Sequence, residues 1–224
     1  MSGILTGKEI RKSIEEGDIT VSPFEPGNIN YEDRINPGSY DLTLGRQIAV
    51  YEAVTVPDFS CRGFDPSTGR TGIPGSRVKP RESSHDDPEE GLCYLDAAQP
   101  NKISKFTMDD RGFLLKPGIG YLGHTVEKIC TTKYIPILDG KSSTGRLFCW
   151  CHVTAGYGDL GFDGQYTLEI VVVQPLVVYP GMRFCQIRFH STLGEPMNYS
   201  DKGNYVGAEA EGPVASRSWK QFRK

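Results

Sequence analysis

The chain has 224 residues, which is enough to bury a sizeable core as one domain without disulfide bonds. Its 25 Lys and Arg against 28 Asp and Glu side chains give a formal net charge of −3, which excludes a protein that coats nucleic acid non-specifically. No run of 18 apolar residues occurs, so we expect no membrane-spanning helix and no membrane partner. The first residues lack a secretory signal pattern, and we interpret the six scattered cysteines as reduced thiols of a cytoplasmic protein.

The chain is expected to begin with one short helix and to continue mainly as strands. Thr6 and Glu9 fit a capping box, Ile10 and Ile14 form an apolar stripe, and Gly17 is a stop signal. Alternating or β-branched runs follow at 40–45, 46–56, 112–129 (divided by a Pro117-Gly118 turn), 148–153, 165–173 and 175–189. Turn glycines recur between them. The pattern predicts an all-β sandwich or barrel rather than an alternating α/β chain.

Two segments lack the strand pattern. Residues 57–105 contain few aliphatic side chains and many Pro, Gly, Ser and charged residues, which predicts a long insertion. That insertion is either a solvated excursion or a lid or interface arm. Residues from about 196 to 224 are similarly polar and Gly-rich and predict a flexible C-terminal tail. We therefore expect a single domain over 1–224 that includes both segments.

The segment GKSSTGR, residues 140–146, has the composition of an anion-binding loop. It matches the second half of a P-loop, but the first glycine of that motif falls at Ile135 and the surroundings are β-rich, so we reject a P-loop. Gly145 lets the backbone approach a ligand closely, and Ser142 and Ser143 offer hydroxyl donors. The guanidinium of Arg146 can bind two phosphate oxygens at once. An ordinary polar turn between strands remains the alternative.

Cys149, Cys151 and His152 resemble part of a metal site. Zinc deaminases use H-x-E with a downstream P-C-x-x-C, whereas here no glutamate follows His152 at that spacing and no C-x-x-C occurs. In a strand the two cysteines share a face while His152 points away, and a zinc site needs four ligands. We therefore expect structural cysteines and no zinc.

Two carboxylates are candidates for chemistry. In the run GQYTLEIVVV, alternation places Thr167 and Glu169 on one face and Tyr166 and Leu168 on the other. A carboxylate in the middle of an apolar strand is costly to bury, so we expect desolvation to raise the pKa of Glu169, which suits a general base. Asp159 lies in a glycine-lined turn, where it can accept a hydrogen bond from a sugar hydroxyl. An exposed or ion-paired strand residue is the alternative for Glu169, and a turn cap is the alternative for Asp159.

The run DGKSSTGRLFCWCHVTAGYGDLGFDGQYTLEI closely resembles the dCTP deaminase family within the trimeric dUTPase superfamily. The stretches YPGMRFCQIRF, GPVASR and GKEIRKSIEEGDITVSPFEPGNI…NPGSYDLTLG resemble further segments of that family, in the same order. The resemblance covers the start of the chain and roughly residues 113–217, but not 57–105. It implies a distorted jelly-roll or β-barrel of the dUTPase-like type.

The resemblance also implies roles for individual residues. Glu169 would be the general base that activates water, and the other catalytic positions would be Ser142, Arg146 and Ala155. The remaining substrate contacts would be Lys141, Ser143, Gly145, Asp159, Thr167, Leu168, Gln186 and Tyr199. Asp159 would contact the deoxyribose, and residues 167–169 would recognise the base. The tail departs from the family pattern at Asn204 and Ala208, where a lysine and a glutamine are typical.

The implied activity is zinc-independent hydrolytic deamination of dCTP to dUTP and ammonia. The implied enzyme is a homotrimer with active sites at subunit interfaces, and its substrate is the magnesium complex of the triphosphate. Some members also cleave the dUTP to dUMP and pyrophosphate, and the dUMP supplies thymidylate synthesis. The dipeptide Gly156-Tyr157 is more similar to the sequence of those bifunctional members at this position. Two alternatives stay open: a pyrophosphatase of the dUTPase type, and a non-catalytic nucleotide-binding regulatory relative.

Overall fold

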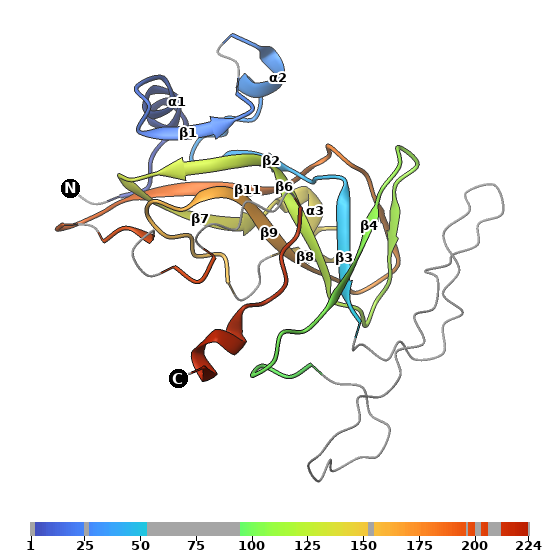
Figure 1. The fold of residues 1–224 in the computed structure, drawn as a ribbon. Coiled ribbons are helices and arrows are strands. Elements are labelled where there is room, and N and C mark those ends of the chain that lie inside the picture. Colours follow the sequence, from blue (N-terminus) through green and yellow to red (C-terminus); the bar gives the residue numbers. More distant parts are fainter. Residues whose placement is uncertain are drawn as a thin grey trace, which may run out of the picture.

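The structure is a computed structural model that describes residues 3–24, 27–52, 95–151, 155–195, 197–199, 203–205 and 212–223. Most of the predicted insertion, His152 and parts of the tail therefore lie outside the described residues. Strands dominate the described part, as Figure 1 shows, and the all-β prediction is confirmed.

The first element is the predicted helix, α1 (Gly7–Glu15). Its N-cap is Thr6, whose Oγ1 accepts a hydrogen bond from the backbone N–H of Glu9 at 3.4 Å. Ile10 is fully buried, and Ile14 packs against the core. Gly17 follows with a φ of +80°, a conformation that ends helices at low cost. The capping residue and the apolar stripe thus explain both the bounds of α1 and the face that it buries.

The described residues form three antiparallel sheets, whose buried side chains make one hydrophobic core. The largest has the order β4-β3-β6-β9-β8, with β1 paired to β6 outside that path. Its strands are β1 (Ile19–Ser22), β3 (Gln47–Tyr51), β4 (Ile103–Thr107), β6 (Tyr121–Thr131), β8 (Cys149–Cys151) and β9 (Asp163–Val172). The second sheet consists of β2 (Tyr40–Thr43), β11 (Arg183–Ser191) and β7 (Tyr134–Gly140), and the third pairs β5 (Phe113–Leu115) with β10 (Leu176–Val178). The other elements of the described part are α2 (Ile29–Glu32), α3 (Ser142–Gly145) and η2 (Ser218–Phe222).

Several strands differ from the predicted runs. Strands β1, β4 and β7 lie outside them, and β4 occupies the end of the predicted 57–105 insertion, where Ser104 and Lys105 obscure the apolar pattern. Pro136 similarly interrupts the pattern of β7, although that strand alternates between buried and partly buried residues. Strand β6 is long rather than short, because it pairs with β1, β3 and β9, and β5 pairs with β10 instead of β6.

Candidate active site

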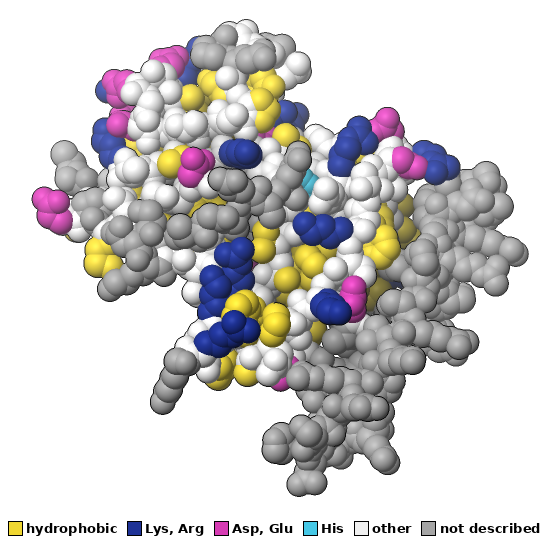
Figure 2. All heavy atoms as spheres, in the orientation of Figure 1, with side chains coloured by type: hydrophobic (Ala, Val, Ile, Leu, Met, Phe, Trp, Pro, Cys, Tyr) yellow, Lys and Arg dark blue, Asp and Glu magenta, His cyan; other side chains and the backbone are white. Residues whose placement is uncertain are grey.

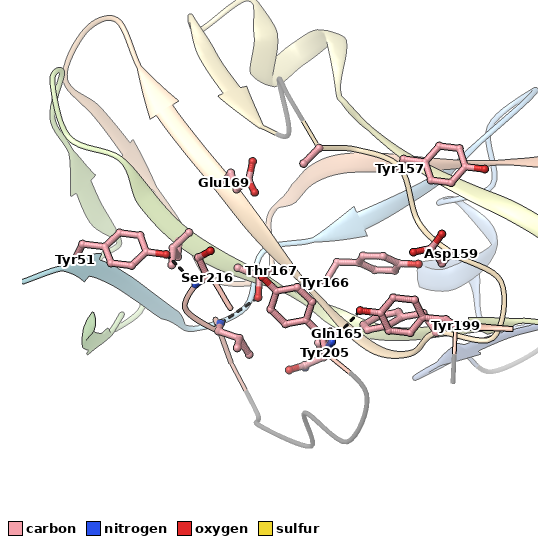
Figure 3. A pocket seen from close by; sticks show the side chains of 14 residues that line it. Tyr51, Tyr157, Asp159, Gln165, Tyr166, Thr167, Glu169, Tyr199, Tyr205 and Ser216 are labelled. Carbon is pink, nitrogen blue, oxygen red and sulfur yellow. Dashed lines mark hydrogen bonds between the residues drawn. The ribbon is translucent and has the colours of Figure 1, made fainter. Parts of the chain in front are cut away.

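A pocket of about 360 Å³ opens beside β9 (Figure 3). Its walls come from β3, β6, β9, the loop between β8 and β9, and the C-terminal tail. Five of the predicted site residues line it together, namely Ala155, Asp159, Thr167, Glu169 and Tyr199. The structure thus brings the candidate base, the candidate sugar contact and part of the predicted base-recognition segment into one cavity.

Glu169 lies in β9 opposite Leu122 of β6, on the same pocket-lining side as Thr167. The side chain of Leu168, between them, is fully buried in the core, so it does not line the pocket. The predicted burial of Glu169 is wrong for the single chain, where the residue is exposed. The reason is that its face of β9 borders an open cavity rather than a packed layer.

Asp159 is exposed at the pocket edge, on a loop fixed to β7. The backbone N–H of Leu138 donates to the carbonyl of Gly156 at 2.7 Å, and the N–H of Gly158 donates to the carbonyl of Pro136 at 2.8 Å. A Cβ at Gly158 would lie 2.9 Å from that carbonyl oxygen, so only glycine allows the approach. The close contact of the loop with β7 sets the position of Asp159.

An aromatic cluster forms the wall next to Asp159. The ring of Phe162 lies 5.0 Å from Tyr166 and 5.6 Å from Tyr199, centroid to centroid. Burial raises the pKa of both tyrosines, and the Asp159 charge adds to the effect. Figure 3 shows Tyr166 pointing from β9 toward Asp159, and its hydroxyl is buried without a hydrogen-bond partner among the described groups.

Tyr166 lines the pocket although alternation placed it on the opposite face of β9 from Thr167. The ladder between β6 and β9 shifts register next to these residues, between His124 and Lys128. At the shift, the N–H of Tyr166 donates to Oγ1 of Thr125 at 3.0 Å instead of to a ladder carbonyl. This irregularity turns consecutive residues of β9 toward one cavity, which simple alternation does not predict.

Tyr166→Phe is expected to increase the free energy of unfolding by about 1 kcal/mol, because a buried hydroxyl without a partner costs roughly 1–3 kcal/mol. Urea denaturation of the two proteins measures the change. Tyr134→Phe is the matched control, since it removes a hydroxyl that accepts a hydrogen bond from Ser13 at 3.3 Å and should decrease stability. A less stable Tyr166→Phe variant would show that a bound water already satisfies the hydroxyl.

The C-terminal tail forms another wall of the pocket. Alternate backbone N–H groups of the tail donate to side-chain oxygens of the sheet: Gly212 to Gln165 at 3.1 Å, Val214 to Thr167 at 3.0 Å and Ser216 to Tyr51 at 2.9 Å. The predicted flexible tail is therefore anchored over residues 212–217 in this structure. Farther on, η2 contains Lys220, and the guanidinium carbon of Arg223, the residue after η2, lies 4.2 Å from the ring centroid of Trp219. Lys, Arg and hydrophobic side chains lie together on this face of the molecule in Figure 2.

The anchoring of the tail depends on Gly212. Its φ is +93°, which L-residues rarely adopt, and a Cβ there would lie 2.2 Å from Oε1 of Gln47. No sequence pattern indicated this contact, because Gln47 and Gly212 are far apart in the chain.

The GKSSTGR segment forms α3, one helical turn between β7 and β8. Thr144 is buried and fixes the turn, whereas Ser142, Ser143, Gly145 and Arg146 are exposed. None of them lines the pocket described above. Lys141 and Gln186 are also outside it, and both bond to groups within the chain. Within a single chain, the predicted phosphate-binding residues therefore lie apart from the predicted catalytic pocket.

The described residues contain no group of three or more His, Cys, Asp and Glu side chains arranged to hold a metal ion. Cys149 and Cys151 are both buried free thiols on one face of β8, as alternation predicted. In the same described part of the chain, no helix is long and apolar enough to span a membrane.

Comparison with known proteins identifies the family. The sequence model of the dCTP deaminase-like family matches residues 4–64 and 77–192. The chain belongs to this family. The resemblance inferred from the motifs is confirmed. The family match also extends into the predicted insertion, so that only residues 65–76 lie outside it between residues 4 and 192.

Relatives in the dCTP deaminase-like family match almost the whole chain. A protein of Clostridium botulinum (strain Eklund 17B / Type B) named "dCTP deaminase, dUMP-forming" is 39% identical over 221 residues, or 99% of each chain. Proteins with the same name are 36% identical over 90% of each chain in Hathewaya histolytica and 34% identical over 99% in Leptospira biflexa serovar Patoc (strain Patoc 1 / Ames).

A solved structure shares the fold. The 2'-deoxycytidine 5'-triphosphate deaminase from Agrobacterium tumefaciens superposes with a TM-score of 0.53 at 21% identity. The alignment covers 93% of this chain but 54% of the other, so this chain spans about half the length of that protein. The likeness supports the dUTPase-like fold class that the motifs predicted.

Proposed function

We propose that this member of the family is a dUMP-forming dCTP deaminase. It would hydrolyse the amino group of dCTP and then cleave the triphosphate, giving ammonia, dUMP and pyrophosphate. The main structural support is the pocket in which Glu169, Ala155, Thr167 and Asp159 meet. The relatives that match 90–99% of their length support the dUMP-forming outcome through their names.

In the deamination step, Glu169 accepts a proton from a water molecule as the resulting hydroxide bonds to C4 of cytosine. Glu169 delivers that proton to N3 and then transfers the proton of the new hydroxyl to the amine. The C4–N bond breaks, ammonia leaves, and a carbonyl remains at C4. The small side chain of Ala155 leaves room for the water in the pocket.

Thr167 is suited to recognising the base. Its Oγ1 already accepts the N–H of Val214, so its own hydroxyl proton is available to an acceptor on the pyrimidine ring. Asp159, at the other part of the pocket, would accept a hydrogen bond from the deoxyribose hydroxyl and help position water for the second hydrolysis. Magnesium would enter as part of the triphosphate complex, which is the substrate.

The proposal includes a homotrimer in which one subunit's α3 completes the pocket of the next. The exposed α3 is bordered by large apolar side chains that the single chain leaves uncovered, namely Leu147, Phe148, Trp150, Tyr157, Val171 and Val173. Apolar groups that gather on a surface are typical of subunit interfaces. A neighbouring subunit would also cover Glu169 and remove the pocket from bulk water. A cytoplasmic location belongs to the same proposal, since the described cysteines are free thiols.

The test is to incubate the protein with magnesium and dCTP, and separately with dUTP, and to measure ammonia, pyrophosphate and the nucleotides. Ammonia and pyrophosphate from dCTP are expected. Ammonia without pyrophosphate would restrict the activity to deamination. Pyrophosphate from dUTP without ammonia from dCTP would favour the dUTPase alternative, and tight binding without turnover would favour a regulatory relative.

A further inference from the structure

Lys141, the residue before α3, is held within the chain. Its Nζ donates to Oδ2 of Asp41 at 2.5 Å, and the two side chains are 24% and 1% exposed. The other carboxylate oxygen of Asp41 accepts a hydrogen bond from Nδ2 of Asn36 at 2.8 Å. Nη1 of Arg183 lies 3.8 Å from Oδ2. Asp41 is therefore a buried carboxylate with both oxygens engaged and two cations nearby.

Gln186 binds Gly140, the residue before Lys141. Its Nε2 donates to the carbonyl of Gly140 at 3.0 Å, and its Oε1 accepts from Oγ of Ser39 at 2.9 Å. Gln186 and Asp41 are register partners in the ladder between β11 and β2. Neighbouring positions of one sheet thus fix residues 140 and 141, directly before the exposed Ser142 and Arg146.

We propose that Asp41 and Gln186 are positioning residues for α3 and that Lys141 is its anchor rather than a phosphate ligand. The inference rests on the proposed function, because it assumes that α3 binds the triphosphate. Moving the Lys141 ammonium to a phosphate would remove the closest counter-charge of a buried carboxylate, which is strongly unfavourable. The cationic contact with the triphosphate would therefore come from the exposed Arg146.

The variant Asp41→Asn separates the two roles of Lys141, because they predict opposite signs. If Lys141 were a phosphate ligand, releasing it from Asp41 would strengthen triphosphate binding. If Lys141 is an anchor, α3 loses its fixed position, and we expect the KM for dCTP to rise about 10-fold or more while kcat changes much less. Inorganic tripolyphosphate, used as a competitor, should lose affinity in parallel.

Further variants test the same arrangement. Adding Lys141→Met to Asp41→Asn should cost little more than Asp41→Asn alone, since both changes break one pair. Ser39→Ala removes only the partner of Gln186 and should raise KM by a smaller factor in a protein that folds normally. Asp18→Asn is the matched control: it breaks the Lys133–Asp18 pair, which touches neither α3 nor the pocket, and should leave KM unchanged.

Tripolyphosphate binding as tight as or tighter than that of the wild type in Asp41→Asn overturns the inference. So does a wild-type KM in Ser39→Ala. Absence of deamination by the wild-type protein would instead reject the proposed function, while the tripolyphosphate comparison still tests the positioning of α3.

Discussion

Glu169→Gln is expected to abolish ammonia release from dCTP while dCTP still binds. The amide keeps the shape of the side chain but cannot accept a proton from water, and a general base typically contributes about 10²–10⁴-fold to the rate. The rate constant for ammonia release should therefore fall by that factor or more, whereas the dissociation constant of dCTP, measured by calorimetry, should change by less than about tenfold.

Glu15→Gln provides the control for this prediction, because it makes the same chemical change on the exposed surface of α1, where Glu15 pairs with Arg11. That variant should retain wild-type kinetics. If Glu169→Gln kept deaminase activity close to the wild-type level, the proton acceptor would have to be a different residue of the pocket. Loss of both activity and dCTP binding would indicate that Glu169 holds the base instead of activating water.

A mixed trimer of Glu169→Gln and Arg146→Ala subunits is expected to recover activity that neither variant has alone. If the pocket of one subunit is completed by α3 of the next, every mixed ring contains one site with both groups intact. Purified mixed trimers should then show about one third of the wild-type activity. Co-expression with two different affinity tags allows these trimers to be isolated and assayed.

The control combines Glu169→Gln with Asp159→Ala, two changes in the lining of the same pocket. Because Glu169 and Asp159 line the pocket of one subunit, every site in a mixed ring of these subunits carries one of the two changes, and no intact site forms. If α3 of one subunit completes the pocket of the next, activity should recover only when Glu169→Gln subunits are mixed with Arg146→Ala subunits. If the mixed Glu169→Gln and Arg146→Ala trimer had no activity, Arg146 and Glu169 of one site would come from the same subunit, and the proposal of a site shared between subunits would be rejected.

The sequence predicted the features that depend on local pattern. The N-cap Thr6 follows from its capping box with Glu9. The placement of Thr167 with Glu169, and of Cys149 with Cys151, follows from the strand period of 2. The glycine-lined turn indicated Asp159, and the family resemblance added Ala155; the structure places both in the same pocket as Glu169.

Features that depend on distant contacts were not predictable in this way. The register shift in the β6–β9 ladder turns Tyr166 into the pocket, and no residue in the sequence marks the position of that shift. The contact between Lys141 and Asp41 was not predictable either, because the two residues lie a hundred positions apart in the chain. The expected burial of Glu169 failed because strand alternation cannot tell whether a face is covered by the same chain.

The anchored tail has a consequence for how the sequence of this region can vary. Its contacts with Gln165, Thr167 and Tyr51 use the backbone N–H groups of the tail, so they place few demands on the side chains at residues 214 and 216. Proline, which has no N–H, is the substitution that each of these positions excludes. Non-proline substitutions at residues 214 and 216 can therefore keep the tail beside β9, provided that the glycine at 212 is kept.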